Sequence, residues 1–167
     1  GGHGVQAIFF DDMCTFGATI TGNVFLRAGN TGVVKFNGGG ESPIINNIMI
    51  DCPKGLQCNG VETATRRVRE FMKGELGQQR LREHVDITTP PYSTAYPVVT
   101  EVYHHKRKVT FPYERNYEVS KDYGQFVAPS EGNYQLKADA EVYRTIPGFT
   151  PIPFEKIGLY QDAYREH

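Results

Sequence analysis

The sequence predicts an all-β fold built as a short parallel β-helix, and three observations support this prediction. Residues 20–26 recur 24 residues later as residues 44–50, with the apolar and asparagine positions kept. A repeat of about 23–24 residues matches one coil of a β-helix, in which each strand pairs with its equivalent one coil further along. The apolar segments are also short, and glycine or asparagine turns separate them too often for useful hairpins. An antiparallel β-sandwich with chance similarity is the alternative.

This repeat places residues of one kind above one another in successive coils. Its apolar pairs are expected to form one buried stripe that faces the inside of the stack. Its asparagine pair falls at one turn, where stacked side-chain amides can hydrogen-bond along the stack and where asparagine tolerates a left-handed backbone. The aligned pairs are Ile20 with Ile44, Asn23 with Asn47, Val24 with Ile48, and Leu26 with Ile50.

A second element recurs beside the first and completes the unit. Residues 32–37 have an earlier counterpart in residues 7–11 and a weaker later one in residues 55–59, which lies 23 residues further along when Gly55 is matched to Gly32. Each unit therefore contains two short apolar strands with glycine or asparagine turns between them.

Residues 59–84 change to a helical pattern. Val61, Ala64, Val68 and Phe71 follow helical spacing, with Asn59 as the expected N-cap and a glycine closing the helix at position 74. A second, weaker helix is expected over residues 75–84. The arginines at positions 66, 67 and 69 are interpreted as a solvated helix face, with contact to a substrate as the alternative.

The remainder of the chain predicts further short strands and a closing tail. Residues 86–98 are expected to be a loop because of their prolines, and residues 104–108 form a basic run, either a solvated loop or an anionic-substrate contact. The tail from residue 147 is rich in aromatic residues and should pack as a cap. The expected strands are 99–103, 108–111, 117–119, 125–127 and 132–136.

The chain is thus interpreted as a single β-helix domain or fragment of 167 residues. Its parts are coils over 1–58, a helical and loop insertion over 59–98, further strands over 99–146, and a C-terminal tail over 147–167.

Composition excludes several classes of protein. A net charge of −1 argues against a dedicated nucleic-acid binder and against electrostatic docking to membranes. No apolar run approaches the roughly 18 residues that a transmembrane helix needs. The three cysteines (Cys14, Cys52 and Cys58) lack metal-binding spacing and are interpreted as small buried apolar residues; a bridge between the last two stays open.

Three segments resemble a known family. The first segment is a strand with an acidic pair (residues 8–12), followed by a Gly-Asn-apolar coil (residues 20–25). The second is an Asn-Asn-apolar coil that ends in Asp-Cys (residues 42–52). Residues 132–137 with 147–159 are similar to the closing strand and tail of the same proteins. Together these segments resemble the C-terminal part of secreted bacterial right-handed parallel β-helix proteins that act on carbohydrates, of the pectate-lyase-like glycoside hydrolase and polysaccharide lyase type.

The resemblance implies a polysaccharide or oligosaccharide partner and a secreted or periplasmic parent protein. Family members are several hundred residues long, with a signal peptide, many coils and an N-terminal cap, whereas this chain starts in a coil. We therefore expect either that further coils cover the open end of the stack or that the chain forms a homo-oligomer through its first coil. No nucleic-acid or membrane partner is expected.

The acidic pair Asp11 and Asp12 is the candidate catalytic site. Sugar-cleaving β-helices use paired carboxylates, one as acid and the other as base or nucleophile. Neighbours in a strand point to opposite sides, so only one of the two should face a cleft. The alternative is that both carboxylates only accept hydrogen bonds from turn amides.

Five further residues are candidates for binding the substrate. Positions near Lys35 and Asn37 lie about 4.8 Å further along the stack from the acidic pair, because that is the spacing of adjacent strands. Glu41 is the nearest acid on that coil, and His3 could reach the same face. A lyase, ranked lower, would take its base or its uronate partner from Lys35 or Arg27. No cofactor is expected; calcium remains a weak alternative, since the sequence has no ladder of carboxylates to bind it.

Overall fold

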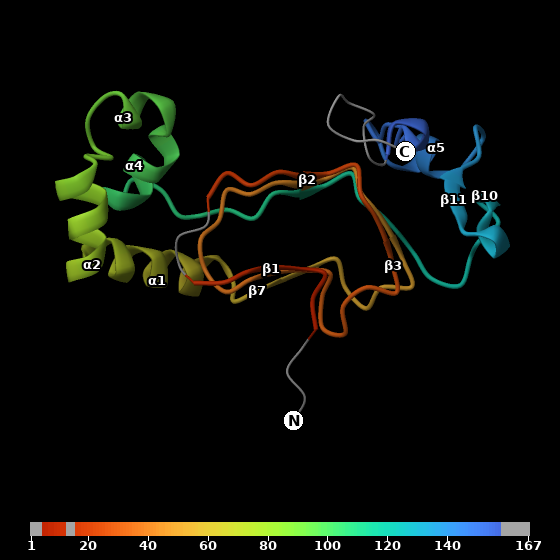
Figure 1. Cartoon of the computed structure of the whole chain (residues 1–167), viewed down its shortest axis with the longest axis horizontal. Helices are drawn as coiled ribbons and strands as arrows, with labels where there is room; N and C mark the ends of the chain where they lie inside the picture. The colour runs from red at the N-terminus through yellow and green to blue at the C-terminus, as the bar shows by residue number, and fades with distance from the viewer. Residues whose placement is uncertain (1–4, 13–15, 158–167) are drawn as a thin grey trace, which may run out of the picture.

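The computed structural model describes residues 5–12 and 16–157, and its centre is three stacks of parallel strands (Figure 1). Each stack contains three strands, and consecutive strands of the chain belong to different stacks, an arrangement compatible with a short parallel β-helix. We call the three successive turns coils 1, 2 and 3. The first sheet is β1 (Ile8–Phe10), β4 (Val34–Phe36) and β7 (Leu56–Cys58); the second is β2 (Ile20–Thr21), β5 (Ile44–Ile45) and β8 (Tyr113–Glu114); the third is β3 (Val24–Leu26), β6 (Ile48–Ile50) and β9 (Tyr117–Val119).

The strand register confirms the 24-residue repeat. Ile20 pairs with Ile44 and Val24 with Ile48, and both pairings are parallel. All pairings among β1–β9 are parallel, which an antiparallel sandwich would not give. The predicted spacing of 23 residues between β4 and β7 is wrong, because Val34 pairs with Leu56.

The apolar stripe of the third sheet faces the opposite way from the prediction. Ile48 and Ile50 are fully buried, but they pack outward, against the C-terminal part of the chain. Phe25 and Met49 are the inward residues of β3 and β6 and belong to the core between the three sheets. The strands alternate as expected for β structure, but β6 is apolar at every position, so the sequence pattern does not distinguish its two faces.

Asparagine side chains form a ladder between the second and third sheets. Asn23 donates to Oδ1 of Asn47 through its backbone amide and its Nδ2, each at 3.0 Å. Asn47 repeats both contacts with Oδ1 of Asn116 in coil 3, at 3.1 and 2.9 Å. The predicted asparagine stack is therefore confirmed, and the structure adds a third member that the sequence repeat did not identify.

Helices occupy the chain between β7 and β8 and lie on one side of the coils (Figure 1). They have their own apolar core, in which Val68, Val102 and Val109 are fully buried. The two predicted helices over 61–84 are present, although the second is half π-helix. The elements are α1 (Val61–Lys73), α2 (Glu75–Gln78), the π-helix η1 (Gln79–His84), α3 (Tyr92–Ala95) and α4 (Pro97–Tyr103).

Four local predictions for this region are wrong. Residues 86–98, predicted as a loop, contain α3 and the start of α4. Gly60, not Asn59, is the N-cap of α1 and makes no side-chain cap hydrogen bond. The predicted strand 99–103 is part of α4, which starts at Pro97, a favourable first helical position. Residues 108–111 form no strand: the Thr110 carbonyl accepts a hydrogen bond from the Glu41 amide at 2.8 Å, but pairing within the sheets begins at β8.

Polar contacts join α1 to α4 and to the segment that leads from α4 back to the coils. Arg69 donates from Nη2 to the Arg107 carbonyl at 2.7 Å and from Nε to the Val102 carbonyl at 3.2 Å. The buried Thr65 hydroxyl accepts from the Val109 amide at 3.1 Å. Of the α1 arginines, Arg66 is exposed and pairs with Glu70, as the solvated-face interpretation expects, whereas Arg69 has a structural role.

Gly77 of α2 lies directly against the last turn of α1. A Cβ atom built at this position would lie 2.1 Å from the Phe71 carbonyl oxygen, far inside van der Waals contact. We expect Gly77→Ala to destabilise the protein by about 2–4 kcal/mol in urea unfolding, as overpacking against a fixed backbone does. Gly124→Ala, where the nearest atom is a side-chain oxygen at 3.3 Å, is the control and should change stability by less than about 1 kcal/mol. Equal losses in the two variants would contradict the tight helix packing.

The C-terminal part packs on the outside of the third sheet. It contains the antiparallel pair β10 (Phe126–Ala128) and β11 (Asn133–Leu136), which agrees with two predicted strands. The 3₁₀ turn η2 (Pro129–Glu131) joins the two strands, and α5 (Val142–Thr145) and the 3₁₀ turn η3 (Phe154–Lys156) follow. Phe149 and Ile152 of the tail are buried against Ile48 and Ile50, so the described part of the tail covers the side of the stack and does not cap its end as predicted. Within the described residues, none of the helices has the length and apolarity needed to cross a membrane.

Candidate functional site

The outer face of the first sheet carries a column of three unlike side chains. Phe9, Lys35 and Gln57 are in register in coils 1, 2 and 3, and all point outward because their neighbours Ile8, Val34 and Leu56 pack inside. Phe9 is 46% exposed although it lies within a strand. The Lys35 ammonium lies 4.9 Å from the centroid of that ring, within cation–π distance. An aromatic face and a positive charge therefore adjoin on an exposed sheet surface.

Asp11 and Asn37 lie at the end of this face, where β1 and β4 finish. Nδ2 of Asn37 donates to Oδ1 of Asp11 at 3.0 Å across one coil. Arg67 of α1 reaches over and donates from Nη1 to the Asn37 carbonyl at 2.9 Å and to Oδ1 of Asn37 at 3.2 Å. The guanidinium and the amide thus fix the position of the Asp11 carboxylate.

These contacts keep Asp11 ionised. The hydrogen bond from Asn37 is the main cause that lowers the pKa of Asp11 below its ordinary value, followed by the amide of Asp12 and the charge of Lys35. A carboxyl group of this kind can act as a base, a nucleophile or a binding group at neutral pH, but it is a poor proton donor. Asp12 is exposed, has a left-handed backbone with φ of 59°, and its amide donates to Oδ1 of Asp11 at 2.9 Å. Asp11 therefore also accepts the turn hydrogen bond that the alternative interpretation expects.

Hydrogen bonds connect the start of the first two strands with Gln57 of this column. Gln6 donates to the Thr31 hydroxyl at 2.9 Å, and that hydroxyl donates to Oε1 of Gln57 at 2.9 Å. These three residues come from successive coils, so polar groups line the face beside the apolar Phe9 ring.

Glu41 does not join the acidic pair. Its carboxylate accepts from Arg107 at 3.1 and 3.2 Å and from the Thr110 amide at 2.7 Å. It therefore anchors the segment that follows α4, and Arg107 of the basic run has the same structural role. His3 lies outside the described residues.

Arg27 lies at a different corner of the coil, directly after β3. It lines an open hollow of about 580 Å³ together with Asp51 and Lys121, at the turn between the third and first sheets. The Asp51 carboxylate accepts from the Lys121 amide at 2.8 Å and from the Tyr123 hydroxyl, and this last bond is the main cause of its lowered pKa. Arg27 and Asp11 thus lie on turns at opposite ends of the strands of the first sheet.

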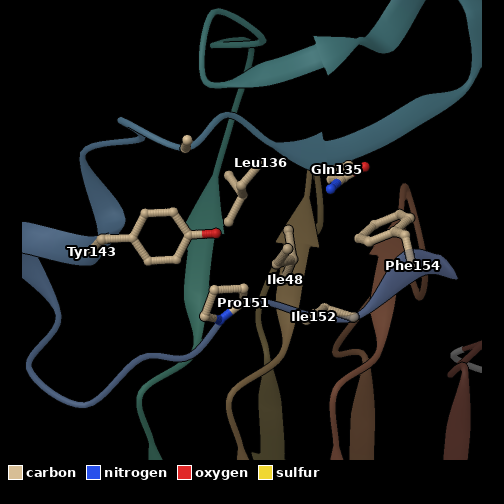
Figure 2. Close-up of a pocket in the computed structure, with 8 residues that line it drawn as sticks. Ile48, Gln135, Leu136, Tyr143, Pro151, Ile152 and Phe154 are labelled. Carbon is tan, nitrogen blue, oxygen red and sulfur yellow. The ribbon is translucent and has the colours of Figure 1, made fainter. Parts of the chain in front are cut away.

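A cavity of about 440 Å³ lies between the third sheet and the C-terminal part (Figure 2). Its walls are mostly apolar, with Ile48 from β6 and Leu136 from β11. Figure 2 shows the Tyr143 ring reaching in from α5 with its hydroxyl group near these side chains. Burial raises the pKa of Tyr143, so the group stays neutral. No carboxylate lines this cavity, so its described walls supply no acid–base pair.

The repeat predicted that Asp11, Lys35 and Asn37 lie near one another, but it did not identify the other members of the site. Phe9 and Gln57 were within predicted strands, and the alternation of β side chains would have placed them beside Lys35. Arg67 gave no such signal, because its contact joins a helix to a strand end 30 residues away.

The remaining chemistry of the described residues is limited. Cys52 and Cys58 are free and half-buried, and Cys14 lies outside the described residues. Within residues 5–12 and 16–157, no group of three or more histidine, cysteine, aspartate or glutamate side chains is arranged to bind a metal ion. Comparisons with protein-family models, with curated proteins and with solved structures found no match.

Proposed function

We propose that this protein binds a polysaccharide on the outer face of the first sheet, with Phe9 as the stacking platform. The observation that carries the proposal is the exposed Phe9 ring beside the Lys35 ammonium on the face that ends at the Asp11–Asn37 pair. An aromatic ring of this kind can cover the apolar C–H face of a sugar. Carboxylate, amide and ammonium groups around it can hydrogen-bond to sugar hydroxyls.

The geometry of the stack favours a chain over an isolated sugar. Side chains on one column follow one another at about 4.8 Å from coil to coil, so neighbouring residues of an extended polymer can each contact a different coil. The hydrogen-bonded series Gln6–Thr31–Gln57 adds polar groups from all three coils. A face of this kind suits a weak, extended interaction along a glycan.

Glycoside hydrolysis at Asp11 is the second candidate function. Its lowered pKa suits the base or the nucleophile of such a reaction. The general acid would have to be another group, and Asp12 is the nearest carboxyl in sequence. A lyase with Lys35 as base is a further alternative.

We infer that the three coils form a right-handed parallel β-helix, because crossover connections between parallel strands are right-handed in about 98% of cases. The parent protein would be secreted or periplasmic, where a polysaccharide partner is accessible.

Two assays test the function. The first is retardation of the protein in native gels that contain one neutral or acidic polysaccharide at a time; retardation by at least one of them is expected.

The second measures release of reducing ends by the wild type, Asp11→Asn and Asp12→Asn. If the protein is a hydrolase, Asp11→Asn should lose about 10²–10⁴-fold in turnover. Unchanged turnover in both variants would remove these residues from catalysis, and retardation without any turnover would leave binding as the function.

A further inference from the structure

The sequence contains two Asn-Gly pairs, and the fold places them in opposite surroundings. Asparagine followed by glycine is especially prone to deamidation, because glycine has no Cβ to hinder attack by its backbone nitrogen on the asparagine side chain. One pair is Asn37–Gly38 at the end of β4, and the other is Asn59–Gly60 in the link between β7 and α1. The surroundings of each pair therefore decide which of them reacts.

The Asn37 side chain is held at both of its polar atoms. Nδ2 donates to Oδ1 of Asp11 at 3.0 Å, and Oδ1 accepts from Nη1 of Arg67 at 3.2 Å. The backbone amide of Asn37 also donates to the Phe10 carbonyl at 3.0 Å, and Gly38 is buried. Attack on this side chain requires these contacts to open first, so the fold protects the pair.

Asn59 and Gly60 have none of these restraints. Both residues are exposed, and neither the Asn59 side chain nor the Gly60 amide forms a hydrogen bond with another described residue. A Cβ atom built at Gly60 would have no heavy atom within 4 Å apart from those of its chain neighbours. The space around this peptide bond is therefore open to solvent and to movement of the side chain.

We propose that Asn59 deamidates spontaneously in the folded protein, whereas Asn37 keeps its amide. The Gly60 nitrogen attacks Cγ of Asn59, and Nδ2 leaves as ammonia with the proton of the Gly60 amide. Water then opens the succinimide that has formed. Cleavage of the new bond to Cγ gives aspartate, and cleavage of the bond to the backbone carbonyl carbon of Asn59 gives isoaspartate. Water is the only other reactant.

The two sites differ in what the reaction would change. At position 59, aspartate adds a negative charge just before α1, where a carboxylate is favourable. Isoaspartate adds one carbon atom to the backbone between β7 and α1. At position 37, the product would place a second carboxylate beside Asp11 and remove the amide that donates to it. The contacts of Asn37 with Asp11 and Arg67 therefore preserve an amide of the candidate site.

Peptide mapping by mass spectrometry tests the proposal on the whole chain, kept folded at mildly alkaline pH in water enriched in heavy oxygen. The peptide with Asn59 should take up heavy oxygen and separate into aspartate and isoaspartate forms. Its rate should exceed that of the peptide with Asn37 by at least about tenfold. In urea, where both pairs are exposed, the two rates should become similar. An unmodified Asn59 in the folded protein, or equal rates at the two sites there, would overturn the proposal.

Gly60→Ala tests the chemistry of the step. The added methyl group hinders the attacking nitrogen, so the reaction at Asn59 should slow by at least about tenfold. Circular dichroism shows whether the variant folds, and the wild-type comparison of the two asparagines stands without it. An unchanged rate at Asn59 in folded Gly60→Ala would contradict attack by the nitrogen of residue 60.

Discussion

Replacing Asn47 by alanine is expected to lower the free energy of unfolding by about 3–5 kcal/mol, because a buried polar network would lose its central member. The Asn47 side chain is fully buried. Its Nδ2 donates to the carbonyls of Ile20 and Ile45 at 3.0 and 3.1 Å and to Oδ1 of Asn116 at 2.9 Å. Its Oδ1 accepts both hydrogen bonds from Asn23. Alanine would leave several of these groups buried without a partner.

Urea unfolding followed by circular dichroism measures this loss. The matched control is Asn23→Ala, since Asn23 belongs to the same ladder but is exposed at its end. This control should lose about 1 kcal/mol or less, because its partners can bind water. Similar losses in both variants, or a loss below about 1 kcal/mol for Asn47→Ala, would show that the ladder does not hold the coils together.

Replacing Phe9 by alanine is expected to weaken polysaccharide binding by about tenfold or more, which corresponds to about 1.4 kcal/mol. The ring contributes the apolar platform of the proposed face, and its removal also deprives Lys35 of its cation–π partner. Phe9→Tyr keeps the aromatic face and should retain most of the affinity. Because Phe9 is 46% exposed, its loss should affect stability much less than the loss of a core residue.

Affinity electrophoresis in gels containing the polysaccharide that retards the wild type measures this effect. Tyr96→Ala is the control: Tyr96 is 61% exposed, just before α4 in the helical region, away from the proposed face. Its retardation should equal that of the wild type. Unchanged binding by Phe9→Ala, or equal weakening by the two variants, would contradict binding on the first sheet.

The stacking of the coils was predictable because the repeat keeps residue types in register. Ile20 and Ile44, and Asn23 and Asn47, are identical pairs at one spacing, and the strands pair at that spacing. The direction of the stripe was not predictable. Ile48 and Ile50 face the C-terminal part, which buries the outside of β6 as completely as its inside. A strand buried on both faces carries no alternation to interpret.

The error at α4 has a different physical origin. Its valines have strand propensity, but Val102 is buried among helix residues, so tertiary packing outweighs that propensity. Pro97 was the available signal, since proline favours the first turn of a helix.

The candidate site was predictable only where it follows the repeat. The Asp11–Asn37 contact joins equivalent positions of two coils, so the strand alignment implied it. The contacts of Arg67 with Asn37 and of Arg107 with Glu41 join the helices to the coils. They depend on how the helices pack on the stack, which no local pattern specifies.

Amide NMR spectra of the labelled protein, titrated with a fragment of the polysaccharide that it binds, test the central claim most directly. Binding on the outer face of the first sheet predicts shift changes at residues 9–11, 35–37 and 57, with the C-terminal part unaffected. Changes centred instead on Leu136, Tyr143 and Phe154 would place the ligand in the apolar cavity of Figure 2 and contradict the proposed site.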